Sequence, residues 1–223
     1  MTRPIRSFVR RSRRITKAQQ HALDTLWPIY GVLTPEGRLN LDALFGRKAK
    51  KMMEIGFGQG DALVTMAKMH PEHDYLGVDV HRPGIGHLLR DIKAAQLTNV
   101  RVLCADAVDV LQYNLLPHCL DTVYLFFPDP WPKKRHHKRR LVQPNFVLML
   151  TQRIKSGGCL HLATDWQNYA EQMLEILEAT PELSNCVNGG GFAPRSPERP
   201  LTRFEQRGLQ LGHGVWDLQY LRQ

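Results

Sequence analysis

A glycine-rich loop between an apolar run and a helical stretch constrains this sequence most. Glu54 ends the apolar run, and Gly56, Gly58 and Gly60 follow it at every second position before a helical pattern at residues 61–69. Glycine is favoured where φ is positive or where a ligand approaches the backbone, because a Cβ atom would block it. The helix start offers free N–H groups to a polar ligand. The pattern predicts a strand, a nucleotide-binding loop and a helix, with a purely structural turn as the alternative.

The spacing of these glycines indicates which nucleotide the loop could bind. A dinucleotide-binding loop has the pattern G-x-G-x-x-G, but the position three after Gly58 is Asp61, and the third glycine comes one residue early. The pattern E-x-G-x-G-x-G instead resembles the first motif of class I methyltransferases that use S-adenosylmethionine. In that class the acid holds the methionine part of the cofactor, and the bare backbone passes the ribose.

Strand and helix patterns alternate along the chain from residue 51 onward. Strands are expected at residues 51–55, 75–78, 100–104, 122–126 and 159–163, and helices at residues 61–70, 85–96, 106–112, 141–154 and 168–179. A short helical turn at residues 23–31 is expected to cap the domain. Alternation of this kind predicts an α/β fold with a parallel sheet and right-handed crossovers. Ligands of such folds lie beyond the carboxyl ends of the strands.

Acidic residues follow the expected strands at this edge of the sheet. Asp79 lies about 20 residues beyond the glycine loop, where an acid commonly accepts hydrogen bonds from ribose hydroxyls. Asp106 is placed to accept a hydrogen bond from an adenine amine, and Asp129 and Asp165 follow the next two strands. Each aspartate could instead cap the next helix, and for Asp106 alone that reading is equally good. Their coincidence at one edge favours a ligand site.

Three prolines stiffen the segment 127–132, because each fixes its own φ and restrains its predecessor. Asp129 and Trp131 are thereby held beside the expected ligand. A carboxylate next to an aromatic ring suits guanine, whose edge carries N–H donors and whose face can stack. The alternative is a turn with Trp131 buried in the core.

The charge of the chain favours an anionic partner. Its formal net charge is +9 and its pI is near 9.6, which fits a nucleic acid or a membrane surface. Cations crowd residues 3–17, and six more lie within residues 133–140, beside the predicted base pocket, which favours nucleic acid. Residues 1–22 are expected to form a flexible basic arm, with an organellar presequence or a solvated tail as alternatives. Residues 23–223 are expected to form one domain.

Other features exclude several classes of protein. No apolar run approaches the roughly 20 residues that span a bilayer, so no membrane association is expected. The four cysteines are scattered without paired spacing, which favours a reducing, cytoplasmic location. The ten histidines show no obvious spacing with cysteines or carboxylates, so no metal site is expected.

Five segments of the chain together resemble the bacterial tRNA (guanine-N7-)-methyltransferase family. They are residues 54–60, 78–81, 127–136, 164–165 and 199–205. The resemblance covers nearly the whole chain, including residues 7–11 and 212–215. Its most specific part is the Pro-Asp-Pro-Trp-Pro-Lys-Lys-Arg-His string at residues 128–136. Asp79 stands where relatives often have Glu, a change that should keep the ribose contact.

The resemblance implies a Rossmann-like class I methyltransferase, with a mostly parallel seven-stranded sheet, helices on both faces and an antiparallel last strand at residues 215–221. It implies methyl transfer from S-adenosyl-L-methionine to N7 of guanine 46 in the tRNA variable loop, without a metal. The implied cofactor-binding residues are Glu54, Asp79, Asp106 and Asp129, to which the backbone argument adds Gly56, Gly58 and Gly60. The implied guanosine-binding residues are Lys133, Asp165, Thr202, Arg203, Phe204 and Glu205.

The expected partner is tRNA, with no obligatory protein partner, and the chain is expected to be a monomer or homodimer. Residues 202–205 could equally be a plain loop before the last strand. Because guanine N7 carries a lone pair and no proton, positioning should supply most of the rate, and Asp129 is the expected catalytic residue.

Three rival functions remain open at this point. Methylation of an exocyclic amine uses an Asp-Pro-Pro-aromatic motif, which Trp131 interrupts. Cytosine C5 methylation needs a nucleophilic thiolate, and no cysteine lies in the segment 127–132. A non-catalytic RNA-binding module is the rival from a different class, and it would not bind S-adenosylmethionine.

Overall fold

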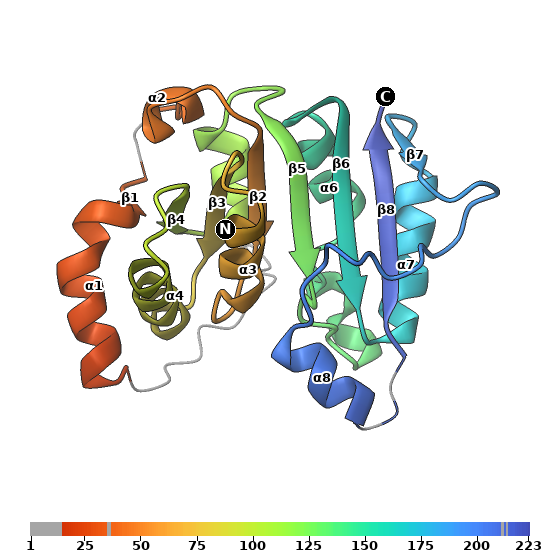
Figure 1. Cartoon of the computed structure of the whole chain (residues 1–223). Helices are drawn as coiled ribbons and strands as arrows, with labels where there is room; N and C mark the ends of the chain where they lie inside the picture. The colour runs from red at the N-terminus through yellow and green to blue at the C-terminus, as the bar shows by residue number, and fades with distance from the viewer. Residues whose placement is uncertain (1–14, 35–36, 211, 213) are drawn as a thin grey trace, which may run out of the picture.

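The computed structural model describes residues 15–34, 37–210, 212 and 214–223. Eight strands form one sheet (Figure 1): β1 (Gly31–Val32), β2 (Lys51–Ile55), β3 (Asp74–Asp79), β4 (Val100–Cys104), β5 (Leu120–Phe126), β6 (Ile154–Thr164), β7 (Leu183–Asn185) and β8 (Trp216–Arg222). Their order is β1-β4-β3-β2-β5-β6-β8-β7. Pairs from β1 to β6 are parallel, whereas β8 is antiparallel to both neighbours. The mostly parallel sheet with an antiparallel last strand is confirmed, and β1 adds a two-residue edge to the seven expected strands.

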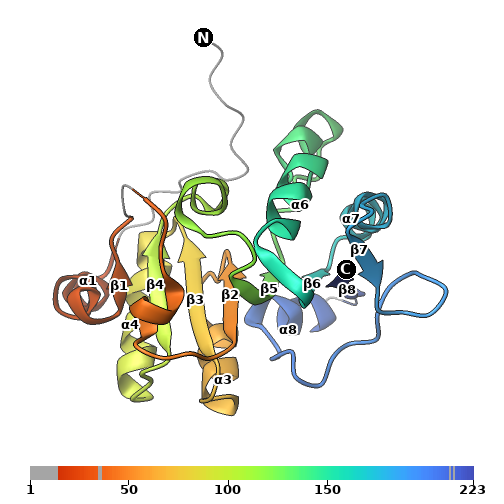
Figure 2. The same ribbon diagram turned by 90° about the horizontal axis from the view of Figure 1, so that it is seen from above.

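Helices cover both faces of this sheet, as expected. The helical elements are α1 (Lys17–Tyr30), α2 (Leu41–Phe45), α3 (Asp61–Met69), α4 (Arg82–Ala94), α5 (Ala107–Asp109), the π-helical turn η1 (Val110–Asn114), the 3-10 helix η2 (Lys134–Arg139), α6 (Pro144–Thr151), α7 (Gln167–Glu178) and α8 (Arg203–Gln210). Figure 2 shows α3 and α4 on one face and α6 and α7 on the other. Helix α1 packs against α4 at the edge that β1 extends.

Several expected boundaries differ from the structure. Helix α1 is longer than the predicted turn at residues 23–31, because a capping box between Thr16 and Gln19 starts it at Lys17. Residues 17–22, which we assigned to the basic arm, are therefore helical, and residues 1–14 lie outside the described residues. Helix α6 is shorter than predicted, since it begins at Pro144 and the chain turns into β6 at Ile154.

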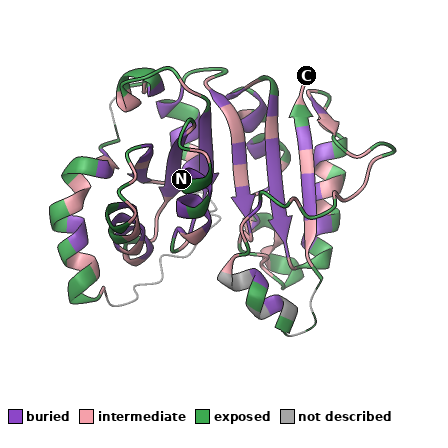
Figure 3. Cartoon of the chain, viewed as in Figure 1, coloured by how far each residue is buried: buried purple, intermediate pink, exposed green. Residues whose placement is uncertain are grey.

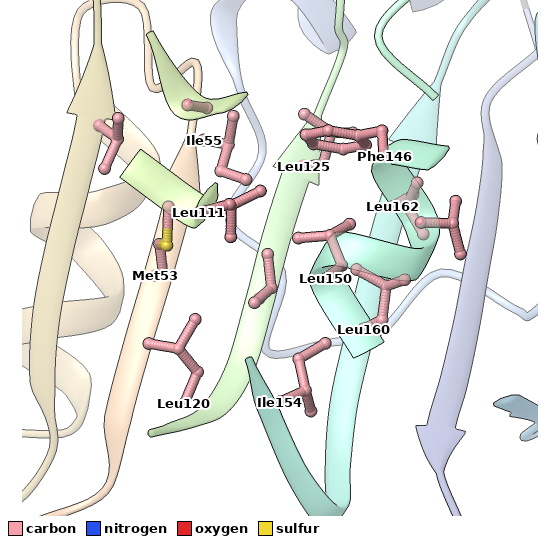
Figure 4. Close-up of a cluster of buried hydrophobic side chains, with 14 of the residues drawn as sticks. Met53, Ile55, Leu111, Leu120, Leu125, Phe146, Leu150, Ile154, Leu160 and Leu162 are labelled. Atoms are coloured by element: carbon pink, nitrogen blue, oxygen red, sulfur yellow. The ribbon is translucent and has the colours of Figure 1, made fainter. Parts of the chain in front are cut away.

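The core consists of two apolar layers, one on each face of the sheet. Alternate residues of β2 point to opposite faces, so Met53 and Ile55 join the layer under α6, whereas Met52 joins the layer under α3 and α4. Figure 4 shows the first layer, in which Phe146 and Leu150 of α6 pack over β5 and β6, and Leu111 of η1 lies beside Met53 of β2. The central strands are therefore buried along most of their length (Figure 3). Within the described residues, none of the helices has the length and apolarity to cross a bilayer.

Candidate active site

The glycine loop joins β2 to α3 in a conformation that other residues rarely adopt. Gly56, Gly58 and Gly60 all have positive φ, of 72°, 60° and 87°. A Cβ atom at Gly56 or Gly58 would meet nothing within 4 Å, whereas one at Gly60 would lie 2.5 Å from the Leu88 side chain of α4. The first two glycines are therefore required by the backbone and leave bare chain beside open space, and the third also allows close helix packing.

Asp79, at the end of β3, fixes this loop. Its Oδ2 accepts a hydrogen bond of 2.9 Å from the Gly58 N–H, and its Oδ1 accepts one of 2.8 Å from the His81 N–H. Burial raises the pKa of Asp79, and the two N–H donors oppose that shift. Each carboxylate oxygen keeps a second lone pair for another donor.

A cavity of about 240 Å³ opens at the carboxyl ends of the central strands. Its walls come from the segments that follow β2, β3, β4 and β5, including Gly56, Asp79, Asp106 and Asp129. Gly58 also lines this cavity, so five of the seven predicted cofactor-binding residues lie in its wall. Glu54 and Gly60 are not among the lining residues.

Glu54 is nonetheless the most unusual ionisable group near this cavity. Its side chain is 3% exposed, and its Oε2 has no hydrogen-bond partner among the described residues. Burial, with smaller contributions from Asp79 and Asp61, raises the pKa of Glu54 to about 8. A buried carboxylate without partners is costly, so this position is suited to a cationic group of a ligand.

Asp106 both caps a helix and lines the cavity. Its carboxylate accepts a hydrogen bond of 3.0 Å from the Val108 N–H at the start of α5. The two sequence interpretations of Asp106 are therefore compatible, because capping uses one lone pair and the residue still faces the cavity.

The proline-rich loop after β5 holds two aromatic residues in a rare backbone conformation. Phe127 and Trp131 have φ of 51° and 44°, which bulky residues adopt only where the surroundings enforce it. The Arg139 guanidinium lies 4.6 Å from the centre of the Trp131 ring. Trp131 is half-buried at the surface, so the alternative that placed it in the core is wrong. Asp129 is exposed between these two residues and faces the cavity.

Arg140 holds this loop, which the sequence did not reveal. The side chain is 2% exposed, and its Nε donates to the Pro130 carbonyl at 2.9 Å. Its Nη1 and Nη2 donate to Gln172 and Asn168 of α7, and the Tyr169 ring lies 4.8 Å away. Arg140 is one of the six cations in residues 133–140 that favoured a nucleic-acid partner, but it is not available to phosphate, because its donors are used inside the protein.

The predicted substrate residues lie at three places in the fold: before η2, after β6 and at the start of α8. Lys133 is exposed at the start of η2. Asp165 follows β6 and lines a cavity of about 490 Å³ together with Trp166 and Trp216. Thr202 caps α8, because its hydroxyl accepts a hydrogen bond of 3.1 Å from the Glu205 N–H. The segment 202–205 therefore begins a helix, and the alternative of a plain loop is wrong. The side chains of Arg203 and Phe204 lie outside the described part of the structure.

Glu205 is buried in an ion-pair network and is 1% exposed. Arg199 donates two hydrogen bonds to it, of 2.6 and 2.8 Å, and Arg195 donates a third of 3.0 Å. Arg199 also donates to Asp217 of β8, which contacts His161 of β6 at 2.8 Å. In this arrangement Glu205 attaches α8 to the sheet, and its predicted role in substrate binding stays a prediction.

Comparison with known proteins identifies the family. A family model described as "Putative methyltransferase" matches residues 48–218. Proteins named tRNA (guanine-N(7)-)-methyltransferase are 56% identical in Alkalilimnicola ehrlichii and 55% identical in Nitrosospira multiformis. The first alignment covers 98% of this chain and 92% of the relative, and the second covers 97% and 93%. The chain belongs to this methyltransferase family.

Solved structures agree with the fold of the methyltransferase. The 16S rRNA methyltransferase KamB has a TM-score of 0.60 at 12% identity, over 82% of this chain and 93% of that chain. The aminoglycoside resistance methyltransferase NpmB1 has a TM-score of 0.55 at 16% identity, over 82% and 92%. At this identity they show the fold alone, and the predicted Rossmann-like class I architecture is confirmed.

One cluster of side chains in the methyltransferase contradicts the statement that no histidine is spaced with carboxylates as metal ligands are. Ligand atoms of His70, Glu72 and His73 all lie within 4.8 Å of one another. Their spacing in the sequence, two histidines flanking a carboxylate within four residues, is compatible with a metal site. The group precedes β3 and so lies at the opposite edge of the sheet from the cavity.

Proposed function

We propose that this chain transfers the methyl group of S-adenosyl-L-methionine to N7 of guanine 46 in the tRNA variable loop, forming 7-methylguanosine. The observation that carries the proposal is the cavity at the strand ends, where Asp79, Asp106 and Asp129 meet beside the glycine loop. The names of the relatives support this reaction for the family. The proposed site of action is cytoplasmic, which the scattered cysteines support.

The residues around the cavity fit S-adenosylmethionine. The unpaired Oε2 of buried Glu54 would accept from the ammonium group of the methionine part. Asp79 would hold the ribose hydroxyls, Asp106 the adenine amine, and the bare backbone at Gly56 and Gly58 leaves room for close approach. The cofactor supplies an electrophilic methyl group on a sulfonium centre.

The chemistry required of the chain is positioning and charge stabilisation. Guanine N7 has an exposed lone pair, so no general base is required at that atom. Holding N7 in line with the methyl group is worth up to roughly 7–11 kcal/mol of the barrier. We assign Asp129 the role of holding the base edge and stabilising the positive charge that develops on the purine. The contacts of Arg140 keep the Asp129 loop rigid, so these interactions need little reorganisation during the reaction.

The tRNA is proposed to lie across the face formed by η2, α8 and the segment after β6. The exposed cations of η2 would contact phosphates; they are Lys133, Lys134, Arg135 and Lys138. Asp165, with Trp166 and Trp216 in the same cavity, offers acceptors and aromatic surface for a nucleoside. Residues 202–205 are proposed to complete this contact, with Glu205 acting by holding the start of α8 in place. Residues 1–16 are proposed to act as a basic arm on the RNA. No protein partner is proposed, and the chain would act as a monomer or homodimer.

The reaction is tested with methyl-labelled S-adenosylmethionine and unmodified tRNA, followed by digestion and identification of the labelled nucleoside. We expect label in 7-methylguanosine, and none when guanine 46 is replaced by adenine. Asp129→Asn should lower turnover by about 10²-fold, whereas Asp24→Asn on the exposed face of α1 should match the wild type. Label in another nucleoside would favour amine methylation. No label despite tight tRNA binding would favour the binding module.

A further inference from the structure

Three potential metal ligands converge in the connection between α3 and β3. The chain reads His70, Pro71, Glu72 and His73 between the last turn of α3 and the first residue of β3. Nδ1 of His70 lies 3.1 Å from Oε1 of Glu72, and Nε2 of His73 lies 3.5 Å from the same oxygen. We propose that His70, Glu72 and His73 form a binding site for a divalent transition-metal ion, with Zn²⁺ as the best-matched ion.

The distances between these atoms resemble those within a coordination sphere. Ligands bonded to tetrahedral Zn²⁺ at about 2.0–2.1 Å lie roughly 3.3–3.4 Å from one another. The two contacts of Glu72 bracket this spacing, and all three donors lie within 4.8 Å of one another, so small side-chain rotations would bring them around one ion. Two imidazoles and one carboxylate suit Zn²⁺ better than Mg²⁺ or Ca²⁺, which prefer oxygen ligands.

The backbone that carries these ligands is held in place from several sides. The buried side chain of Asn99 donates through its Nδ2 to the carbonyls of Ala67, His70 and His73, at 3.1, 3.4 and 2.9 Å. Arg47 donates to the carbonyls of Pro71 and His73 at 2.8 and 3.2 Å. The site is therefore preorganised, which is what a local site with three ligands requires.

The surroundings leave a coordination position open. His70 and His73 line a cavity of about 370 Å³ on the face of the sheet that α3 covers. A three-ligand zinc site keeps its fourth position for water, and this cavity provides room for it. Because the group lies at the amino end of β3, away from the methyl-transfer cavity, its expected effect is to link the end of α3 to the sheet. This proposal does not depend on the proposed function.

The test is titration of the metal-free, untagged full chain with Zn²⁺ by calorimetry. We expect the wild type to bind one more ion per chain than His70→Ala, His73→Ala and Glu72→Gln, or to bind it at least about tenfold more tightly. Zn²⁺ should also raise the melting temperature of the wild type and not that of the variants. His87→Ala is the matched control, because it removes a histidine that contacts one carboxylate, Asp91, at 3.3 Å.

Cobalt(II) as a probe separates this site from the cysteine thiols, two of which, Cys104 and Cys186, are exposed. The wild type should give a Co²⁺ spectrum without a thiolate-to-metal charge-transfer band. Glu72 is exposed, so Glu72→Gln keeps the fold even if a histidine variant does not, and its melting temperature without metal checks this. No binding by the wild type, equal binding by Glu72→Gln, or a thiolate band would each overturn the proposal and leave a simple ion pair.

Discussion

Glu54 and Glu205 are both almost completely buried, and their surroundings are opposite. Glu54 lies at the end of β2 beside the glycine loop, and its Oε2 has no partner among the described residues. Glu205 lies in the first turn of α8, and both of its oxygens accept hydrogen bonds from arginines. Burial raises the pKa of Glu54 to about 8. Burial also acts to raise the pKa of Glu205, but the bonds from Arg199 and Arg195 outweigh it and lower the pKa.

This difference separates a carboxylate that supports the fold from one that is available to a ligand. A buried charge that is fully paired is part of the scaffold, and removing its partner leaves the other charge uncompensated. A buried carboxylate without a partner lowers the stability of the free protein, and a cationic ligand can recover that free energy. The N-terminal half of the sheet therefore carries the feature expected of a binding site, and the C-terminal half carries the feature expected of a structural clamp.

The largest effect is expected from Glu205→Ala. The substitution leaves the buried Arg199 with Asp217 alone, so the free energy of unfolding should fall by about 3 kcal/mol, the lower end of the range for breaking a buried pair. Urea unfolding followed by circular dichroism measures this. Glu175→Ala, on the exposed side of α7, is the control and should change stability by less than about 0.5 kcal/mol. If Glu205→Ala changed the free energy of unfolding as little as this control does, Glu205 would not be a structural residue and its contrast with Glu54 would be lost.

The pH dependence of stability should have opposite signs at the two residues. The folded pKa of Glu54 is about 8 and its ordinary value is 4.5, so its contribution is fully present below pH 4.5 and is lost as the pH rises through 8. Glu54→Gln should therefore gain about 2 kcal/mol relative to the wild type between pH 5 and pH 6.5, since each pH unit contributes at most about 1.4 kcal/mol.

For Glu205 the folded pKa is lowered, so its contribution is present above pH 4.5 and is lost as the pH falls below that value. The stability difference between Glu205→Gln and the wild type should shrink only in this acidic range. Urea unfolding of both variants at a series of pH values measures the two curves. Parallel curves for Glu54→Gln and the wild type from pH 5 to pH 8 would contradict the assignment of Glu54.

The smallest effect is expected on cofactor affinity. Glu54→Gln replaces a charge-assisted hydrogen bond to a cationic group by a neutral one, so the Kd for S-adenosylmethionine should rise roughly tenfold, or about 1.4 kcal/mol. Calorimetry measures this, and Glu205→Gln, assayed where it is folded, should bind within about twofold of the wild type. Calorimetry at pH 7 in buffers of different ionisation enthalpy should also show proton release by the wild type and not by Glu54→Gln. Equal Kd values for the two glutamate variants would remove the distinction.

The two capping motifs show how much sequence alone can predict. The S/T-x-x-E/Q spacing that is typical of a helix start occurs at Thr16 with Gln19 and at Thr202 with Glu205. In the structure a helix begins at each of these places. We missed the starts of α1 and α8 because the surrounding residues are polar and basic, so hydrophobic periodicity was weak. The signal was local and could have been found.

The long-range contacts of Arg140 and Arg199 could not have been predicted in this way. Arg140 reaches Asn168, 28 residues away, and Arg199 reaches Asp217, 18 residues away. In the sequence, each arginine belongs to a basic or mixed-charge run that is equally compatible with a solvated face. The partner of a buried arginine depends on how α7 and β8 pack, and no local pattern contains that information.

The sequence by itself determined the α/β order, the glycine loop and the acids that gather at one edge, because a parallel sheet brings the carboxyl ends of its strands together whatever the details of packing. The tertiary structure alone decided which charges are paired. It left Oε2 of Glu54 without a hydrogen-bond partner among the described residues and enclosed Glu205 between two arginines. It also withdrew Arg140 from the surface and brought His70 and His73 to one carboxylate. The physical reason is that burial and pairing depend on contacts between residues distant in sequence, and these set the cost of each charge.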